Sequence, residues 1–539
     1  DIHLHSGYES NLYDKNLGSF MYIWIFSGLA VVVVLMASFN FSVLSVARSS
    51  ERATEIGIKK VNGAGQIHII GQFMAESLFQ TLLATCAGAA LIMLLLPWFN
   101  RLTGQSIDFH YSLKMLFNLG AITLVTGIIA GIYPSFFLAS LQPKGILKNG
   151  TLTGSKSGII RMLVTVQFFV AIFFLTATFF FMKQLNYIRN RNLGFSHENM
   201  VVIPTGLWYA NSGFKNELMK NPDILGVSAS VYAPVDFGWK ITMPLVHRGI
   251  TDSINLSLFW VDEDFARTYQ LEMVKGQFLQ MDYAAFWKEM KNSGKEKQNE
   301  GEPALTFPVV INETAEKMLG FNDPVGQRLG DKVIVGVVKD FHFRPLHQPI
   351  GPLMMLNDPQ NMGTINVKIS GANREKTLRY IRDTYRKYRD QRDFTYSFFD
   401  DLLTAKYLQE IRLKDIFAIF SALAIVICVL GILGMAVFSI KRRTKEIGIR
   451  KVTGARISEV MTLLISDFVK WVGVAFVFAT LISVFVLHKW LENFAYKTEL
   501  SWWIFALAGI LALGIALLTV SWQSWRAATR NPVEALRYE

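Results

Sequence analysis

The sequence predicts an α-helical membrane protein that carries an inserted soluble α+β domain on one side of the membrane. Two observations support this fold class. The chain has 539 residues, of which 51% are hydrophobic, and its mean hydropathy of +0.30 is too apolar for a soluble protein of this size. Long apolar runs lie at both ends, and a polar, charged stretch lies in the middle. Each run is long enough to cross a bilayer, which takes about 20 apolar residues in a helix.

Seven apolar segments are predicted to span the membrane. The stretch Trp24–Phe39, with four consecutive valines, is the clearest span, whereas 466–489 is the weakest because Asp467 and Lys470 lie in its first turns. The spacing Gly127-x-x-x-Gly131 would let two helices approach closely, since small residues let backbones come near each other, but ordinary packing is the preferred explanation for it. The predicted spans are 20–46, 74–98, 112–139, 159–182, 414–440, 466–489 and 501–525.

The basic residues mark one side of the membrane. The formal net charge is +12, and Lys and Arg gather in short segments between the spans. The opposite loops, 99–111 and 490–500, hold only Arg101 and Lys497 as Lys or Arg residues. Short loops rich in Lys and Arg stay in the cytoplasm, so the charge reflects topology within a lipid bilayer and no nucleic-acid partner is predicted. The predicted cytoplasmic segments are 48–60, 144–161, 441–456 and the C-terminal tail.

The polar middle of the chain, 183–413, is predicted to be a folded domain on the outer side. Short β-rich runs alternate there with helical stretches, which is typical of an α+β domain. The stretch 292–302 is polar without periodicity and is predicted to be a mobile surface loop. The predicted strands include 201–203, 309–311, 333–338 and 365–369, and the predicted helices lie near 213–220, 313–319 and 373–389.

An eleven-residue motif occurs twice and indicates an internal duplication. Glu55–Gly65 recurs 391 residues later as Glu446–Arg456, with eight of the eleven positions identical. In both copies one span precedes the motif and another follows it, which a single duplication explains. The second repeat has four spans and the first has three, so an eighth span and a first outer domain are expected upstream in the natural protein. The predicted parts are 1–19 (the end of that first outer domain), 20–158 (the first three spans), 159–182 (the first span of the second unit), 183–413 (the outer domain) and 414–539 (three further spans and the tail).

The repeated motif is a candidate docking element for a cytoplasmic partner. It combines apolar with charged residues and breaks at a glycine, which predicts a short amphipathic helix along the membrane face. The alternative is a positively charged topology loop, but such a loop needs only Lys and Arg and not eight identical residues. The candidate contact residues are Glu55, Ile56, Gly57, Ile58, Lys59, Lys60, Gly63 and Ala64 in the first copy and Glu446, Ile447, Gly448, Ile449, Arg450, Lys451, Gly454 and Ala455 in the second.

The paired motif resembles the FtsX-like permeases of ABC transporters, and 183–413 resembles the MacB-type periplasmic core. The outer matches are Asn192–Phe195, Val309–Ala315, Asp323–Gly326 and Gly336–Phe341. The resemblance implies a permease of the bacterial inner membrane without enzymatic activity, moved by a separate, dimeric cytoplasmic ABC ATPase that itself binds ATP and Mg²⁺. It also implies that motion passes through the spans to the periplasmic domain, for export or mechanotransmission. A periplasmic adaptor or an outer-membrane channel is a candidate further partner.

Other tasks fit the same resemblance. A permease of this superfamily could release lipoproteins or control a cell-wall hydrolase. The alternative from another class is a membrane-anchored sensor whose outer domain binds a ligand. A sensor should tolerate the loss of the motif contacts, whereas a permease should not.

Three patterns that could indicate other chemistry are set aside. Gly150–Ser157 lacks the glycine that precedes the lysine of a phosphate loop, because Ser155 stands there. Asp340, His342 and His347 lack a defined metal-ligand geometry. The two cysteines of the chain lie inside apolar segments, so no disulfide framework is predicted. The chain is therefore predicted to hold neither a metal nor a cofactor.

Two acidic residues in the predicted spans, Glu76 and Asp467, occupy matching positions in the two repeats. Acidic groups in spans are costly and often functional. Both are predicted near the cytoplasmic start of their helices, where the helix dipole favours negative charge. A helix contact or a part in coupling is the alternative.

Overall fold

The computed structural model divides the chain into two compact units. The membrane unit comprises Asp1–Gln184, Glu410–Trp490 and Glu499–Glu539, and the outer domain comprises Leu185–Gln409 and Leu491–Thr498. The structure describes residues 20–103, 112–140, 157–205, 212–235, 240–247, 250–280, 307–358, 361–388, 393–442, 446–447, 449–450 and 453–529. The expected end of a first outer domain (1–19), most of Gly150–Ser157 and the predicted loop 292–302 lie outside these residues.

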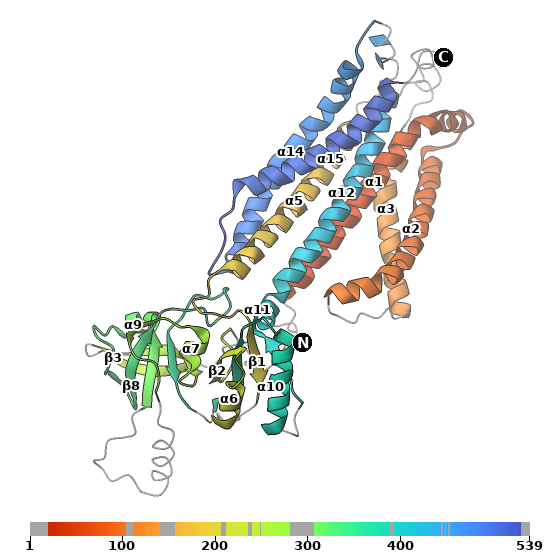
Figure 1. Cartoon of the computed structure of the whole chain (residues 1–539). Coiled ribbons are helices and arrows are strands. Elements are labelled where there is room, and N and C mark those ends of the chain that lie inside the picture. The colour runs from red at the N-terminus through yellow and green to blue at the C-terminus, as the bar shows by residue number, and fades with distance from the viewer. Residues whose placement is uncertain are drawn as a thin grey trace. The chain divides into compact units, whose positions relative to one another are not determined.

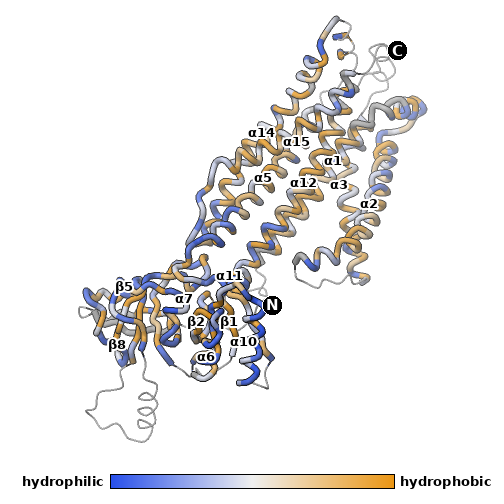
Figure 2. The backbone as a smooth tube through the Cα atoms, in the orientation of Figure 1, coloured by the Kyte–Doolittle hydropathy of each residue, from blue (hydrophilic) through white to orange (hydrophobic). Residues whose placement is uncertain are grey.

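Seven helices in the described part of the chain are long and apolar enough to cross a membrane. In Figure 2 their tubes are largely orange, which marks hydrophobic residues along most of their length. The fold class predicted from the sequence is therefore confirmed. The helices are α1 (Phe20–Val61), α2 (Gln66–Thr103), α3 (Leu113–Ala139), α5 (Ser157–Asn190), α12 (Leu408–Arg442), α14 (Ile457–Leu491) and α15 (Trp502–Ala528).

Small residues let these helices approach closely. A Cβ atom on Gly127 of α3 would lie 2.7 Å from Cδ2 of Leu78 in α2, and one on Gly131 would lie 2.9 Å from Cβ of Ser77. Both glycines of this spacing therefore lie in close contact with α2. On the other side of α3, the Ser42 hydroxyl of α1 donates a hydrogen bond to the Ala130 carbonyl at 2.9 Å.

The two repeats meet where α1 and α12 lie side by side (Figure 1). A Cβ atom on Gly434 of α12 would lie 2.6 Å from Cδ2 of Leu44 in α1. Helix α5 joins both helices, because Gln167 Nε2 donates to the Met36 carbonyl at 3.3 Å and the hydroxyls of Thr178 and Ser421 lie 3.0 Å apart. The membrane unit is thus held by buried contacts between its repeats.

The outer domain contains two sheets. The first has the strand order β11-β1-β10-β2, and the second has the order β3-β4-β9-β6-β8-β5, with β7 paired to β8. The predicted strands are found in β1, β6, β8 and β10. The strands are β1 (Met200–Pro204), β2 (Ile224–Ser230), β3 (Lys240–His247), β4 (Ile250–Trp260), β5 (Met273–Gly276), β6 (Phe307–Asn312), β7 (Arg328–Leu329), β8 (Lys332–Val338), β9 (Leu353–Leu356), β10 (Thr364–Ile369) and β11 (Ser397–Phe398).

Short helices complete the outer domain. Those predicted near 213–220, 313–319 and 373–389 are found as α6, α9 and α10. The helices are α6 (Ser212–Leu218), α7 (Phe265–Tyr269), α9 (Glu313–Leu319), α10 (Arg374–Tyr388) and α11 (Phe399–Lys406). Helix α10 is amphipathic: its apolar side chains, Ile381 among them, pack on the first sheet, while its charged side chains face out.

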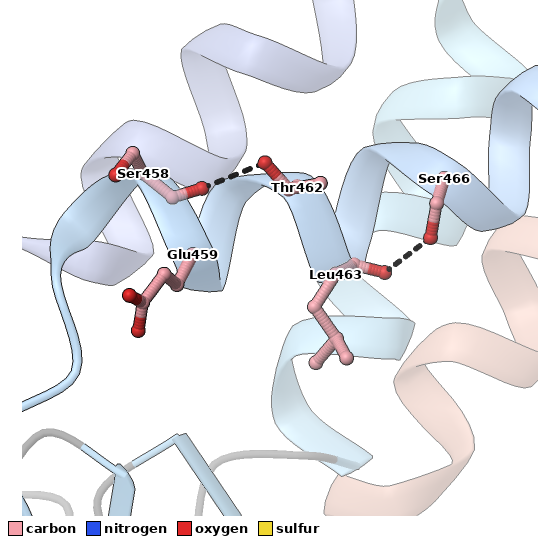
Figure 3. A pocket seen from close by; sticks show the side chains of 5 residues that line it. All are labelled: Ser458, Glu459, Thr462, Leu463 and Ser466. Atoms are coloured by element: carbon pink, nitrogen blue, oxygen red, sulfur yellow. Dashed lines mark hydrogen bonds between the residues drawn. The ribbon is translucent and has the colours of Figure 1, made fainter.

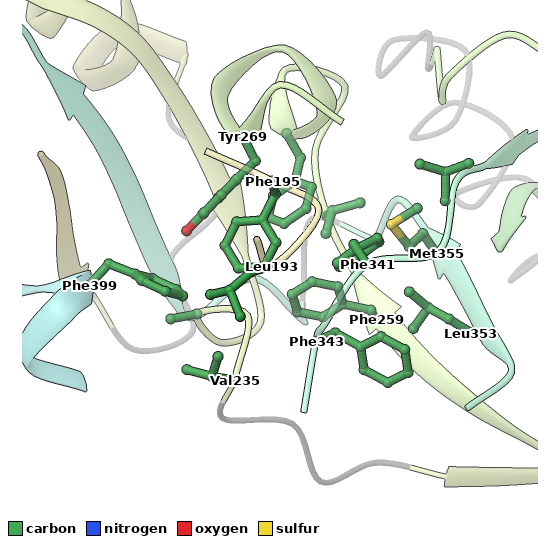
Figure 4. Packing of buried hydrophobic residues seen from close by; sticks show 14 of the residues in the cluster. Leu193, Phe195, Val235, Phe259, Tyr269, Phe341, Phe343, Leu353, Met355 and Phe399 are labelled. Atoms are coloured by element: carbon green, nitrogen blue, oxygen red, sulfur yellow. The ribbon is translucent and has the colours of Figure 1, made fainter. Parts of the chain in front are cut away.

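One aromatic cluster joins the two sheets of the outer domain (Figure 4). The Phe195 ring meets Phe341 edge-on, with 5.9 Å between centroids, and meets Phe399 edge-on at 5.5 Å. Gly194 precedes Phe195 with a φ of +83°, and a Cβ atom there would lie 3.0 Å from the Phe341 Cα. The run Asn192–Phe195 is therefore constrained by a backbone shape and a close contact that only glycine allows.

Candidate functional site

The first copy of the motif forms the end of α1. The helix runs without a break from the span through Glu55 to Val61, so the predicted separate helix is not found. The turn that follows is closed by a hydrogen bond from the Ala64 amide to the Lys59 carbonyl at 2.9 Å. Gly63 stands in this turn with a φ of +91°, a conformation that favours glycine.

The second copy repeats this turn. The Ala455 amide donates to the Arg450 carbonyl at 2.9 Å, and Gly454 has a φ of +95°. Gly448 and Lys451 lie outside the described residues. Two segments 391 residues apart thus reach the same local structure.

Each copy carries the same ion pair on its surface. Glu55 and Lys59 lie 2.7 Å apart, and Glu446 and Arg450 lie 2.8 Å apart, each pair one helical turn apart. Lys59 lowers the pKa of Glu55, so this carboxylate stays charged at neutral pH. Exposed pairs of this kind contribute only a few tenths of a kcal/mol, so their main effect is to define the charge of the surface.

One isoleucine of each copy is buried and another is exposed. Ile56 is 1% exposed and packs with Ile69 at the start of α2, and Ile447 packs in the same way with Val460 of α14. Ile58 and its counterpart Ile449 are 53% and 52% exposed. The buried isoleucine anchors the motif to the following helix, and the exposed one is available for contact with a partner.

Lys60 ties the first motif to the end of α3. Its ammonium donates to the Ala139 carbonyl at 2.6 Å, where the helix has no further amide to offer. Partial burial lowers the pKa of Lys60. Lys59 also donates to Gln72 of α2 at 3.1 Å. The motif is thus attached to both later helices of its repeat.

The acidic residues of the spans lie deeper in their helices than predicted. Glu76 is in the third turn of α2, because this helix begins at Gln66, and the dipole effect is limited to the first turn. Its carboxylate instead accepts two hydrogen bonds from Arg52 of α1, at 2.7 and 2.9 Å. A contact with a neighbouring helix, the alternative given above, therefore explains the position of Glu76, and the helix dipole does not. The side chain of Asp467 lies outside the described residues.

A shallow hollow lies beside the first turns of α14, directly after the second motif (Figure 3). The Thr462 hydroxyl donates to the Ser458 carbonyl at 2.9 Å, and Ser466 donates to the Leu463 carbonyl at 3.1 Å. These small polar side chains are thus bonded to their own helix. The lining residues are Ser458, Glu459, Thr462, Leu463 and Ser466.

In the outer domain, the residues set aside as metal ligands have structural partners. Asp340 accepts hydrogen bonds from the amide and hydroxyl of Thr314, at 3.0 and 2.7 Å, and from Asn312 at 2.7 Å. His342 and His347 pack against aromatic rings. No group of three or more metal-binding side chains is found in the part of the chain that the structure describes.

Comparison with known proteins identifies the repeated unit. The family model for the C-terminal domain of FtsX-like permeases matches residues 27–143 and 418–532, and each match contains one copy of the motif. Two segments of the chain are thus similar to FtsX-like permeases. Together with the seven apolar helices, they indicate a multi-pass membrane protein with an extracytoplasmic α+β domain between the two matched segments.

Individual relatives are distant. The chain is 24% identical over 119 residues to the macrolide export ATP-binding/permease protein MacB of Psychrobacter cryohalolentis, and 29% identical over 119 residues to the pyoverdine export ATP-binding/permease protein PvdT of Pseudomonas syringae. Each alignment covers 22% of this chain and 18% of the relative. The crystal structure of the extracellular domain of the noncanonical ABC-type transporter YknZ from Gram-positive bacteria aligns at 12% identity with a TM-score of 0.23, covering 36% of this chain and 99% of that chain.

Sequence reasoning missed the residues that hold the FtsX-like motifs in place. Ile69 and Val460, the partners of the buried isoleucines, stand 391 residues apart, so the offset of the repeat could have indicated them. Arg52, the partner of Glu76, recurs at the same offset as Arg443, just as Glu76 recurs as Asp467, so the offset could have indicated this pair as well.

Proposed function

We propose that this chain is the permease of an ABC-type transporter and that a separate cytoplasmic ATPase acts on its two FtsX-like motifs. The observation that carries the proposal is that both motifs end in the same turn, with the same ion pair, one buried isoleucine and one exposed isoleucine. A pair of equivalent contact elements suits a dimeric partner, since each element can meet one copy of the same surface.

The attachment of the motifs suits the transmission of force. The first motif is continuous with α1, a helix of 42 residues. A push on the motif would move this helix as a body, because the buried Ile56 and the bonded Lys60 resist local bending. The motion would then reach the outer domain for export or mechanotransmission, rather than draw a substrate through a membrane channel.

The assignment of ATP binding to another chain is part of the proposal. The named relatives are ATP-binding/permease proteins, and this chain aligns with 18% of their length. We place ATP and Mg²⁺ on the partner ATPase and expect no enzymatic activity from the permease itself. We also propose that the protein lies in the bacterial inner membrane, with a periplasmic adaptor or an outer-membrane channel as a further partner.

The exposed isoleucines provide the test. Changing Ile58→Asp and Ile449→Asp together should reduce copurification of the ATPase at least tenfold, because the charges enter an apolar contact. The thermal unfolding midpoint should not move, since both side chains are exposed. Met318→Asp is the matched control, because Met318 is 50% exposed but lies in the outer domain. Unchanged copurification and ATP turnover in the double variant would remove the coupling role and favour a sensor.

A further inference from the structure

The loop between the last two membrane helices belongs to the outer domain. The chain leaves α14 at Leu491 and enters α15 at Trp502, and Leu491–Thr498 group with the outer domain and not with the helices they join. We call Leu491–Thr498 the strap. It is distant in sequence from the rest of the outer domain, which ends at Gln409.

The strap is hydrogen-bonded to the segment that follows β8. The Ala495 amide donates to the His347 carbonyl at 3.2 Å, and the Tyr496 amide donates to the Leu346 carbonyl at 3.3 Å. The Tyr496 hydroxyl accepts a bond from the Ile350 amide at 3.3 Å. Backbone bonds at two successive residues define one register for the strap.

Aromatic rings pack the strap against the same segment. The His347 ring stacks on Phe494, with 4.5 Å between centroids and 26° between planes, and His342 meets Tyr496 edge-on at 4.6 Å. Phe494 is only 3% exposed. The strap is therefore part of a buried interface, not a loop resting on a surface.

The strap also meets both covalent connections of the outer domain to its membrane helices. The Arg191 guanidinium, just beyond α5, lies 4.6 Å from the Tyr496 ring centroid. Tyr407, just before α12, also stacks on the His347 ring, with 5.5 Å between centroids, and its hydroxyl accepts a hydrogen bond from the Leu346 amide at 2.8 Å. The ends of α5 and α12 and the α14–α15 loop thus converge on one segment.

Helix α14 connects this strap directly to the second FtsX-like motif. The helix begins at Ile457, three residues after Gly454, and ends at Leu491, the first residue of the strap. Its 35 residues contain no proline and span about 52 Å at 1.5 Å per residue. The corresponding helix of the first repeat, α2, contains Pro97, which removes one helical hydrogen bond.

We propose that α14 acts as a rod that carries motion of the second motif to the outer domain through the strap, with Phe494 and Tyr496 as positioning residues. This proposal rests on the proposed function, because it needs an ATPase that moves the motif. In addition to the covalent connections through α5 and α12, motion would reach the outer domain through α14 and the strap. This additional route belongs to the second repeat. The strap stays attached to the outer domain throughout the cycle, since a rod must remain joined to its load.

The attachment itself can be tested without an ATPase. In the full chain reconstituted in lipid nanodiscs, the amides of Ala495 and Tyr496 should exchange hydrogen for deuterium at least a hundredfold more slowly than in the variant Phe494→Ala/Tyr496→Ala. Equal, fast exchange in both proteins would show that the strap is not held and would overturn the proposal.

The route is tested with a cysteine pair that can be opened and closed. The Ala495 amide is hydrogen-bonded to the His347 carbonyl, so cysteines at these two positions are close enough to attempt a disulfide. The variant is His347→Cys/Ala495→Cys, made in a background in which Cys86→Ala and Cys428→Ala remove the native thiols. The reduced pair lacks the stacked His347 ring, and the oxidised pair replaces this contact with a covalent bond. His347→Cys without a partner thiol is the control for oxidation.

The readout is a response of α10, away from the strap. In the complex with the copurified ATPase, trapping with ATP and vanadate should change the rate of hydrogen–deuterium exchange in α10 in the wild type and in the oxidised cysteine pair. In the reduced pair this change should be at least fivefold smaller. A full response in the reduced pair, or its loss in the oxidised pair, would overturn the rod. Failure of any ATPase to copurify would instead overturn the proposed function, and the nanodisc exchange would still decide whether the strap is attached.

Discussion

Asn40 of α1 faces Gly431 of α12, and the two residues hold the same position in the two repeats. The Asn40 Oδ1 atom lies 3.5 Å from the place where a Cβ atom of Gly431 would stand, and Gln167 Oε1 of α5 lies 2.6 Å from it. Neither oxygen has a hydrogen-bond donor within the described residues, although both side chains are buried. Equivalent helices therefore cross at equivalent residues, and the absence of a side chain on one of them makes room for two amides.

This crossing predicts the effect of one added methyl group. Gly431→Ala should lower the free energy of unfolding by about 1–3 kcal/mol, because the new Cβ overlaps Gln167 Oε1 in a packed core. Unfolding in mixed detergent micelles measures the change. The further change Gln167→Ala should recover part of the loss. Gly473→Ala is the control, since no atom lies within 4 Å of its added Cβ; equal losses at both glycines would contradict the explanation.

The two motif turns predict a backbone cost without a steric one. Gly63→Ala and Gly454→Ala should each destabilise the protein by about 1 kcal/mol, because both glycines have a positive φ while no atom lies near an added Cβ. Thermal unfolding of each variant measures the loss. Gly71→Ala, in the helical part of α2 with equally open space, should be neutral or slightly stabilising. A neutral Gly63→Ala would show that the turn is not formed in the protein.

Asn312 predicts a large loss in the outer domain. Its buried amide accepts from the amides of Ala315 and Leu353, at 3.0 and 2.8 Å, and donates to Asp340 and to the Gly351 carbonyl, at 2.7 and 3.0 Å. Asn312→Ala should therefore cost about 2–4 kcal/mol, because several buried groups lose their partner.

Hydrogen exchange of the outer domain in the full chain measures this loss. Gln327→Ala is the control, because the side chain of Gln327 is exposed. Its cost should stay within about 0.5 kcal/mol. A similar cost for the two variants would contradict the assigned role of Asn312.

His342 predicts a pH dependence of the outer domain. Burial and the nearby Arg191 lower its pKa from 6.5 to about 4. The unfolded chain therefore binds a proton between these values and the folded chain does not, so stability is full above pH 6.5 and falls as the pH drops toward 4. The loss should reach about 1–3 kcal/mol.

The variant His342→Gln isolates this contribution. Burial raises the pKa of Asp262 to about 7. Protonation of Asp262 therefore stabilises the folded domain as the pH falls from 7 toward 3.8, whereas protonation of His342 destabilises it. The difference in unfolding midpoint between wild type and His342→Gln should thus be compared at pH 7.5 and pH 5. A difference that does not change with pH would refute the assigned shift.

Several features of the fold could be predicted because they depend on short stretches of sequence. The spans follow from apolar length, and α3 (Leu113–Ala139) differs by one residue from the predicted 112–139. The two-copy organisation follows from the motif at a constant offset. The strands β1, β6, β8 and β10 follow from short β-branched runs. The spans and strands each depend on a property of about 25 residues or fewer, whereas the duplication is found by comparing two short segments 391 residues apart.

The candidate site was only partly predictable. The repeated motif is visible in the sequence, but the continuity of its first copy with α1 is not, because charged residues such as Glu55 suggest a helix outside the span. The partner of Glu76 was also missed, since its bond to Arg52 depends on how α1 and α2 pack.

The sequence by itself determined the spans, the duplication and the residues of the two motifs, because apolar length and the identity of two short segments can be read from the residues alone. Only the tertiary structure decided which residues meet across long separations: Asn40 with Gly431, and Phe494 with His347. Such contacts depend on helix packing and on a loop that joins a distant domain, and no property of either partner alone encodes them. The strap is the clearest case, because residues between two membrane helices fold as part of the outer domain.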